Sequence, residues 1–139
     1  IALYRELARQ DIVEVRKKIT LLKIGTSKSE IREFRRSLVE SNDKNHQRLT
    51  KSNDFFNLSA LRDLIFHVQE HRFTLLQIKS CLDELGLNFC GFENKDTISN
   101  FRAFHGKDAD IYDLALWHQY EQSNPHAFAE MYQFWCQKL

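Results

Sequence analysis

Titratable side chains gather in one short segment, residues 62–73, where they alternate with apolar residues. Imidazoles change protonation near neutral pH, carboxylates orient them, and guanidinium groups bind carboxylates or phosphates through paired hydrogen bonds. These residue types indicate the wall of a catalytic or binding site. We take His67, Glu70 and His71 as candidate catalytic groups and Arg72 as a candidate substrate-binding group.

The same segment has a purely structural interpretation. Ion-pair networks also concentrate charges, so Asp63 and Glu70 could be paired with Arg62 and Arg72 in a half-buried stretch of chain. Spacing alone does not separate the two interpretations, and both stay open at this point.

Two further candidates lie at the start of the chain. Residues 1–4 form a short apolar run that ends at Arg5 and Glu6, which is typical of a buried strand whose tip opens onto a polar edge. Open α/β sheets bind ligands at such tips. Tyr4 and Glu6 are therefore candidate substrate-binding residues.

Two amphipathic helices are expected next, over residues 11–22 and 27–38. Gly25 is expected to end the first helix as a cap residue, and Ser27 with Glu30 has the spacing of a capping box for the second. Polar residues 41–51, which include His46, predict an exposed connection. Phe55 and Phe56 are then expected to return the chain to the core.

The second half of the chain predicts strands beside helices. Thr74 and Gln77 form a second capping box, an apolar face made by Leu75, Ile78, Leu82 and Leu85 follows, and Gly86 ends the helix. A short strand over 87–93 comes next, with Cys90 and Phe92 on the face opposite Leu87, Phe89 and Gly91. Further short helices follow, with Asp96 or Thr97, Asp110 and Asn124 as expected caps, before an aromatic strand over 131–136. This order indicates an α/β fold rather than a helical bundle.

Composition excludes several function classes. The net charge of +1 gives no electrostatic reason for a nucleic-acid role, and no apolar run is long enough to span a bilayer. His67 and His71 have no evident third ligand, so we expect no metal site. The three cysteines, Cys81, Cys90 and Cys136, sit among apolar residues, which suggests buried free thiols in a reducing, cytoplasmic location.

The segment Phe73-Thr74-Leu75-Leu76-Gln77-Ile78, running to Leu85-Gly86-Leu87-Asn88-Phe89, resembles the C-terminal half of class I S-adenosylmethionine-dependent methyltransferases. More narrowly, the chain is similar to the last part of bacterial proteins that join tetratricopeptide repeats to such a domain. The stretches that carry this narrower resemblance are 3–4, 6–9, 62–74, 91–93, 117–118, 121–125 and 131–138.

The resemblance implies a Rossmann-like sheet of which this chain supplies three short strands. Residues 1–4 would end the fifth strand, residues 11–60 would form a helical insertion that often covers the substrate, and residues 61–139 would form the C-terminal α/β portion. Within that portion, residues 87–92 would be the sixth strand and residues 131–137 the antiparallel seventh. The cofactor S-adenosylmethionine would be held mainly by an upstream half, so this chain would contribute the acceptor side.

Two functions therefore remain in view. The first is the acceptor-side portion of a methyltransferase whose methyl acceptor is unknown. This portion would be inactive alone, and the longer protein could bind protein partners through upstream repeats. The second is a helical interaction or regulatory module without catalysis. Because the chain opens on Ile1, we also expect a fragment of a longer polypeptide, with self-association through an unpaired sheet edge.

Overall fold

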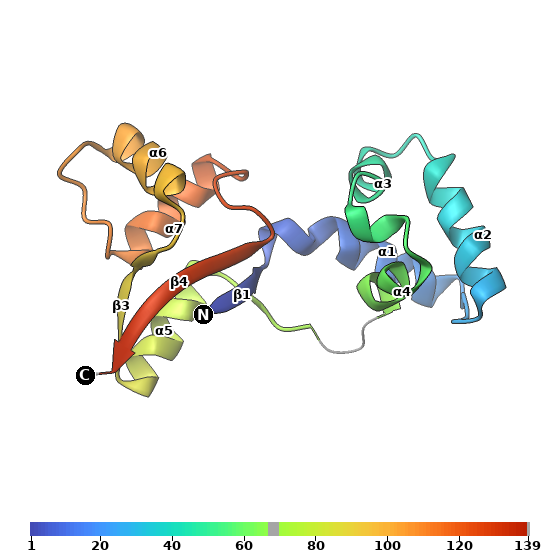
Figure 1. Cartoon of the computed structure of the whole chain (residues 1–139), viewed down its shortest axis with the longest axis horizontal. Helices are drawn as coiled ribbons and strands as arrows, with labels where there is room; N and C mark the ends of the chain where they lie inside the picture. The colour runs from blue at the N-terminus through green and yellow to red at the C-terminus, as the bar shows by residue number, and fades with distance from the viewer. Residues whose placement is uncertain (67–69, 139) are drawn as a thin grey trace. The chain divides into compact units, whose positions relative to one another are not determined.

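The computed structural model describes residues 1–66 and 70–138 and divides the chain into two compact units. The sheet unit comprises Ile1–Ala8 and His71–Leu139, and the helical unit comprises Arg9–Glu70. Figure 1 shows the elements of both units along the chain. The fold is mixed α/β, as the order of helices and strands predicted.

The sheet unit contains a four-stranded sheet in the order β2-β1-β4-β3. Its strands are β1 (Ala2–Arg5), β2 (Arg72–Phe73), β3 (Leu87–Phe92) and β4 (Met131–Lys138). Strand β1 is parallel to β2, whereas β4 runs antiparallel to both β1 and β3. The sequence predicted the other three strands but not β2, because a strand of two residues is too short to show alternation.

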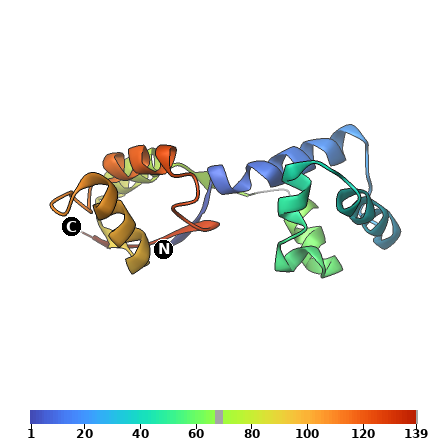
Figure 2. The ribbon, with the colours of Figure 1, turned by 90° about the horizontal axis from the view of Figure 1, so that it is seen from above.

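Three helices pack on this sheet, namely α5 (Leu75–Leu85), α6 (Lys95–His105) and α7 (Leu114–Ser123). Helices α5 and α7 are in contact with each other, and α5 and α6 both contact β3 (Figures 1 and 2). Their shared core is strongly aromatic, with Trp117 stacked on Phe101 at 3.8 Å between ring centroids. Burying these large rings supplies most of the apolar contact that stabilises the sheet unit.

Helix α5 forms as its end signals predicted. The Thr74 hydroxyl accepts a hydrogen bond from the Gln77 amide, the Gln77 side chain accepts one from the Thr74 amide, and Gly86 ends the helix in the left-handed conformation with φ 63°. Leu75, Ile78 and Leu82 are buried. The prediction for Leu85 was wrong, because this side chain is 67% exposed.

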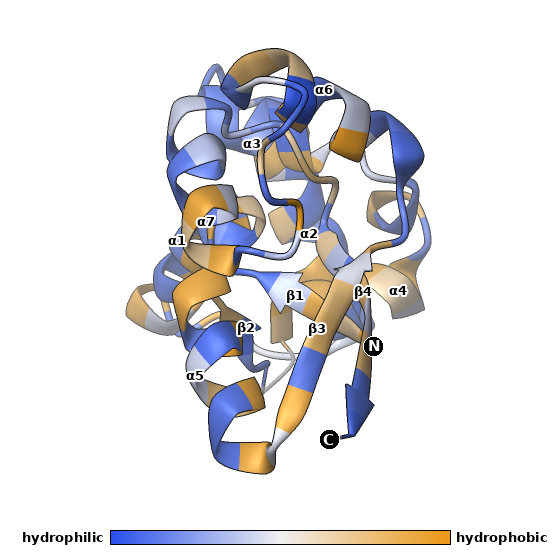
Figure 3. Cartoon of the chain, turned by 90° about the vertical axis from the view of Figure 1, so that its left-hand side faces the viewer, coloured by the Kyte–Doolittle hydropathy of each residue, from blue (hydrophilic) through white to orange (hydrophobic). Residues whose placement is uncertain are grey.

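Strand β3 differs from the predicted alternation. The register shifts between Phe89 and Gly91, so an extra residue separates the two positions. A bulge of this kind moves the following side chain to the other face. Phe92 therefore joins Phe89 in the core, with 5.1 Å between their ring centroids, instead of facing away from it. Figure 3 shows the largely apolar β3 beside α5.

Three expected caps are also corrected. Asn94 caps α6 by accepting from the Asp96 and Thr97 amides, and Asp113 rather than Asp110 caps α7. Asn124 is the residue that follows the last turn of α7, and no helix begins there.

The helical unit is built from α1 (Gln10–Leu21), α2 (Lys28–Val39), α3 (Lys44–Leu49) and α4 (Leu58–Phe66), with short 3₁₀ turns at Leu7–Arg9 and Asn53–Phe55. Its own core is formed by apolar residues from all four helices. The predicted capping box at Ser27 and Glu30 is present at the start of α2. The first unit boundary falls within the Leu7–Arg9 turn.

Several expectations for this unit were wrong. Helix α1 ends with Lys23, not Gly25, in the left-handed conformation at φ 53°. The stretch 41–51 contains α3, where His46 is buried and hydrogen-bonded to Ser41 at 2.7 Å. Phe56 is 71% exposed, although Phe55 beside it is buried.

The cysteines also depart from expectation, because Cys81 and Cys90 are exposed and Cys136 is half-buried. All three thiols are free. Among the described residues, no helix has the length and apolar character needed to cross a membrane.

Candidate functional site

The pairing of β1 with β2 brings three of the predicted site residues together. Tyr4 lies opposite Arg72 in the parallel register, and the Glu6 amide donates to the Phe73 carbonyl at 3.1 Å. The Arg72 Nε atom is 3.5 Å from Glu6 Oε2, so the two charged side chains form an ion pair. Tyr4 and Glu6 lie at the carboxyl end of β1, the kind of place where open α/β sheets bind ligands, and Arg72 lies beside them as the first residue of the parallel strand β2.

Arg72 is only partly satisfied by this ion pair. Its side chain is 25% exposed, yet its Nε and Nη1 atoms are buried and make no hydrogen bond within the described part of the chain. Glu6 is more open, with 42% of its side chain exposed. A guanidinium group carries five donors in a fixed fork, so Arg72 keeps donor capacity that Glu6 does not use.

Arg5, one residue before Glu6, is by contrast fully engaged. Its Nε atom donates to Glu121 Oε1 at 2.9 Å, and its Nη2 atom lies 2.8 Å from the same oxygen. The remaining donors bind backbone carbonyls: Nη2 binds that of Pro125 at 2.9 Å, and Nη1 binds those of Phe128 and Ala129. Arg5 is 2% exposed, so this arrangement fixes the loop after α7 against the end of β1.

Tyr132 completes the buried cluster. Its hydroxyl hydrogen-bonds the two Glu121 carboxylate oxygens at 2.8 and 2.7 Å. Burial, together with the hydrogen bond and negative charge of Glu121, raises the pKa of Tyr132 well above its ordinary value. The cluster formed by Arg5, Glu121 and Tyr132 is therefore structural, because its polar groups satisfy one another and none of the three residues is more than 2% exposed.

Glu70 is engaged within the helical unit. One carboxylate oxygen is 3.5 Å from Arg9 Nε, and the other is 3.1 Å from Arg16 Nη2. Arg16 also donates to the Leu64 carbonyl at 2.7 Å, which ties Glu70 to the last turn of α4. The structural interpretation of this segment suggested a pair between Glu70 and Arg72, but Arg72 pairs with Glu6. This geometry favours a structural role for Glu70.

Of the two candidate histidines, the structure describes only His71. His71 is exposed and directly precedes Arg72 in the sheet unit. His67 lies outside the described residues. Tyr4, Glu6, His71 and Arg72 therefore make up the candidate site of the sheet unit.

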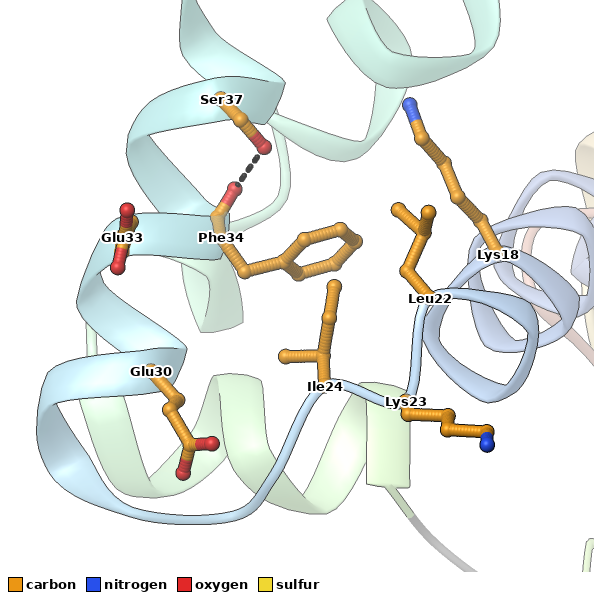
Figure 4. Close-up of a pocket in the computed structure, with 8 residues that line it drawn as sticks. All are labelled: Lys18, Leu22, Lys23, Ile24, Glu30, Glu33, Phe34 and Ser37. Carbon is orange, nitrogen blue, oxygen red and sulfur yellow. Dashed lines mark hydrogen bonds between the residues drawn. The ribbon is translucent and has the colours of Figure 1, made fainter.

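The helical unit contains a separate hollow of about 480 Å³ beside the end of α1 and the start of α2. Figure 4 shows the Phe34 ring, Leu22 and Ile24 pointing toward a common space, while the Lys23 ammonium group points away from it. Charged residues and Ser37 complete the lining, which also includes Lys18, Glu30 and Glu33. The hollow thus has an apolar centre and a charged rim, without a converging set of catalytic groups.

Neither unit offers a metal site in its described residues, since no three His, Cys, Asp or Glu side chains are grouped to hold an ion. A scan against models of known protein families gives no match for this chain, and a search of curated proteins gives none either.

Proposed function

We propose that this chain is the acceptor-side portion of an S-adenosylmethionine-dependent methyltransferase of the Rossmann-like class, and that the cofactor-binding half lies upstream in a longer polypeptide. The observation that supports this proposal most directly is the position of Tyr4 and Glu6 at the carboxyl end of β1, with Arg72 beside them at the start of the parallel strand β2. Ligand sites of open α/β sheets occur at this place.

The arrangement of the sheet gives independent support. The resemblance implies a last strand that runs antiparallel to the others, and β4 is antiparallel to both of its neighbours, β1 and β3. It also implies a helical insertion after the first strand, and the helical unit Arg9–Glu70 occupies that position in the chain. This order of elements supports the proposal.

The residues of this chain do not fit a cofactor cradle of their own. The dinucleotide-type cradle needs glycines that let a ligand approach the start of a helix. Gly25 precedes α2, but an added Cβ there would already lie 2.4 Å from a Glu30 carboxylate oxygen, so that space is filled by an anion. Gly86 ends a helix and Gly91 lies at the β3 bulge. We therefore assign cofactor binding to the upstream half.

In this proposal the chain contributes alignment of the acceptor. Methyl transfer needs the acceptor atom to be held in line with the methyl group, and a base only where the acceptor must lose a proton. Glu6 and Arg72 are placed to hold the acceptor through hydrogen bonds and charge. His71, exposed beside them, is the candidate base of the sheet unit.

The test uses the natural polypeptide that contains this chain, with tritium-labelled S-adenosylmethionine as the donor and a cell extract as the source of acceptors. We expect Arg72→Gln to lower methyl incorporation at least about tenfold, since a lost charged contact costs about 1.5–3 kcal/mol. The affinity for S-adenosylmethionine should not change. Arg102→Gln, at an exposed position on α6, is the matched control.

Loss of incorporation in both variants, or loss of cofactor affinity in Arg72→Gln, would contradict an acceptor-side role. Full incorporation by Arg72→Gln would remove this residue from the acceptor site.

A second candidate function is a helical module that binds a protein partner. The helical unit has its own core and still exposes large apolar side chains, among them Leu21, Leu22, Val39 and Phe56, at 57–82% of their surface. The hollow at Phe34 could accept an apolar side chain of a partner. Replacing Leu22 and Phe56 by serine should abolish partner binding in that case, and should leave S-adenosylmethionine-dependent incorporation unchanged if the module is a separate function.

A further inference from the structure

Arg72 has hydrogen-bond donors that the described part of the chain does not use. We infer that Arg72 binds an anionic oxygen group of the methyl acceptor, a carboxylate or a phosphate, beside the carboxyl end of β1. That the bound anion belongs to the methyl acceptor rests on the proposed function, whereas the anion site itself follows from the geometry.

The comparison with Arg5 shows what a satisfied arginine looks like in this fold. Arg5 directs its guanidinium group at one carboxylate and three backbone carbonyls. Arg72 lies on the neighbouring strand β2, and its Nε atom has one ion-pair partner, Glu6, at 3.5 Å. Neither this Nε nor the buried Nη1 atom makes a hydrogen bond within the described residues. Buried donors without partners are rare and costly, so an arginine of this kind calls for an acceptor that is supplied from outside.

The chemistry of the guanidinium group selects the ligand. Its planar fork matches the paired oxygens of a carboxylate or a phosphate, and this bidentate arrangement is the strongest that arginine makes with a small ligand. Arg16, which also pairs with a carboxylate, already donates to the Leu64 carbonyl and to Glu70. Arg72 is therefore the candidate anion-binding group of the sheet unit.

Glu6 has a defined part in this site. At 3.5 Å it holds the guanidinium group in place, but its negative charge also repels an incoming anion. The site should therefore bind anions weakly, which suits an acceptor that must leave after one methyl transfer. The two residues have opposite predicted effects: removing the charge of Arg72 weakens anion binding, whereas removing the charge of Glu6 strengthens it.

The experiment is an NMR titration of the chain with sodium acetate and, separately, with sodium phosphate, against sodium chloride at matched ionic strength. We expect saturable shifts of the Arg72 side-chain Nε–H signal and of the Tyr4 and Phe73 amides. Glu6→Gln should tighten binding about threefold to tenfold. Arg72→Gln, followed through the Tyr4 and Phe73 amides, should abolish it, and Arg72→Lys should retain weaker binding. Arg102→Gln should bind as the unchanged chain does.

The two probes identify the anionic group of the acceptor. Tighter binding of acetate would assign a carboxylate to it, and tighter binding of phosphate would assign a phosphoryl group. The inference is overturned if neither probe gives saturable shifts, if Arg72→Gln binds as well as the unchanged chain, or if Glu6→Gln binds more weakly. Anion binding by a polypeptide that does not bind S-adenosylmethionine would retain the anion site and reject the proposed function. Cofactor-dependent methyl incorporation without anion binding would retain the proposed function and reject the anion site.

Discussion

At the scale of single residues, the Arg5–Glu121 pair dominates the sheet unit. Removing one partner of a buried pair leaves the other charge without compensation, at a cost of about 3–5 kcal/mol. We therefore expect Glu121→Ala to lower the free energy of unfolding by that amount, measured by urea denaturation. The control is Asp83→Ala, which breaks the exposed pair with Lys79 and should cost about 1 kcal/mol or less.

Equal, small losses in both variants would show that Arg5 is held by the backbone carbonyls alone.

The buried Tyr132 hydroxyl should make the free energy of unfolding fall at alkaline pH. Its pKa in the folded chain is raised by burial and by Glu121, whereas in the unfolded chain it titrates near its ordinary value of about 10. The stabilisation is therefore complete below about pH 10 and falls as the pH rises further, because only the unfolded chain then releases the proton. Between pH 10 and 11 the unchanged chain should lose about 1 kcal/mol more than Tyr132→Phe.

Urea denaturation at pH 8, 10 and 11 measures this difference, and parallel losses in the two proteins would contradict the assignment.

Residue-scale contacts were the least predictable from sequence. Arg72 was predicted as a site residue from its type and Glu6 from its place at the tip of a strand, but their pairing follows from a two-residue strand that has no sequence signal. Arg5 and Glu121 are 116 positions apart, and nothing local marks either as buried. The structural interpretation paired Glu70 with Arg62 or Arg72, whereas it pairs with Arg9 and Arg16, since residue spacing does not specify which of several cations folds against a carboxylate.

At the scale of elements, helix α1 ends in a strained backbone conformation at Lys23 that a substitution could relieve. Lys23 adopts φ 53°, and the Ile24 amide donates to the Ile19 carbonyl while the Lys23 amide donates to that of Thr20, which is the hydrogen-bond pattern of a Schellman cap. A left-handed conformation costs a residue with a side chain about 1 kcal/mol. Lys23→Gly should therefore raise the free energy of unfolding by about 0.5–1 kcal/mol.

Lys23→Ala serves as the control, because it removes the lysine and retains the unfavourable Cβ, so it should give no gain. A gain with alanine equal to that with glycine would mean that the lysine side chain, and not the backbone conformation, is the source of strain.

Elements with local end signals were predicted well. The capping boxes at Ser27 and Thr74 and the glycine stop at Gly86 depend on residues three or fewer positions from the helix ends, so sequence alone specifies them. The same reasoning gave a wrong prediction for Gly25. Glycine is needed there because Glu30 approaches closely, and its carboxylate accepts a hydrogen bond from the Gly25 amide at 3.2 Å. The β3 bulge was missed because a period-two pattern assumes an uninterrupted ladder.

At the scale of the whole molecule, the chain joins a sheet unit to a helical unit inserted after the first strand. The order of helices and strands was enough to predict an α/β fold, and the antiparallel last strand agrees with what the resemblance implies. The proposed function depends on one statement about the whole, namely that cofactor and acceptor sites belong to different parts of a longer polypeptide.

Calorimetric titration of S-adenosylmethionine tests this statement most directly. The titration is made into the 139-residue chain and, in parallel, into the longer polypeptide that the proposal implies. The proposal predicts binding by the longer polypeptide only, with an affinity that Arg72→Gln does not change. Binding by the 139-residue chain would contradict the placement of the cofactor site, and binding by neither would contradict the methyltransferase proposal itself.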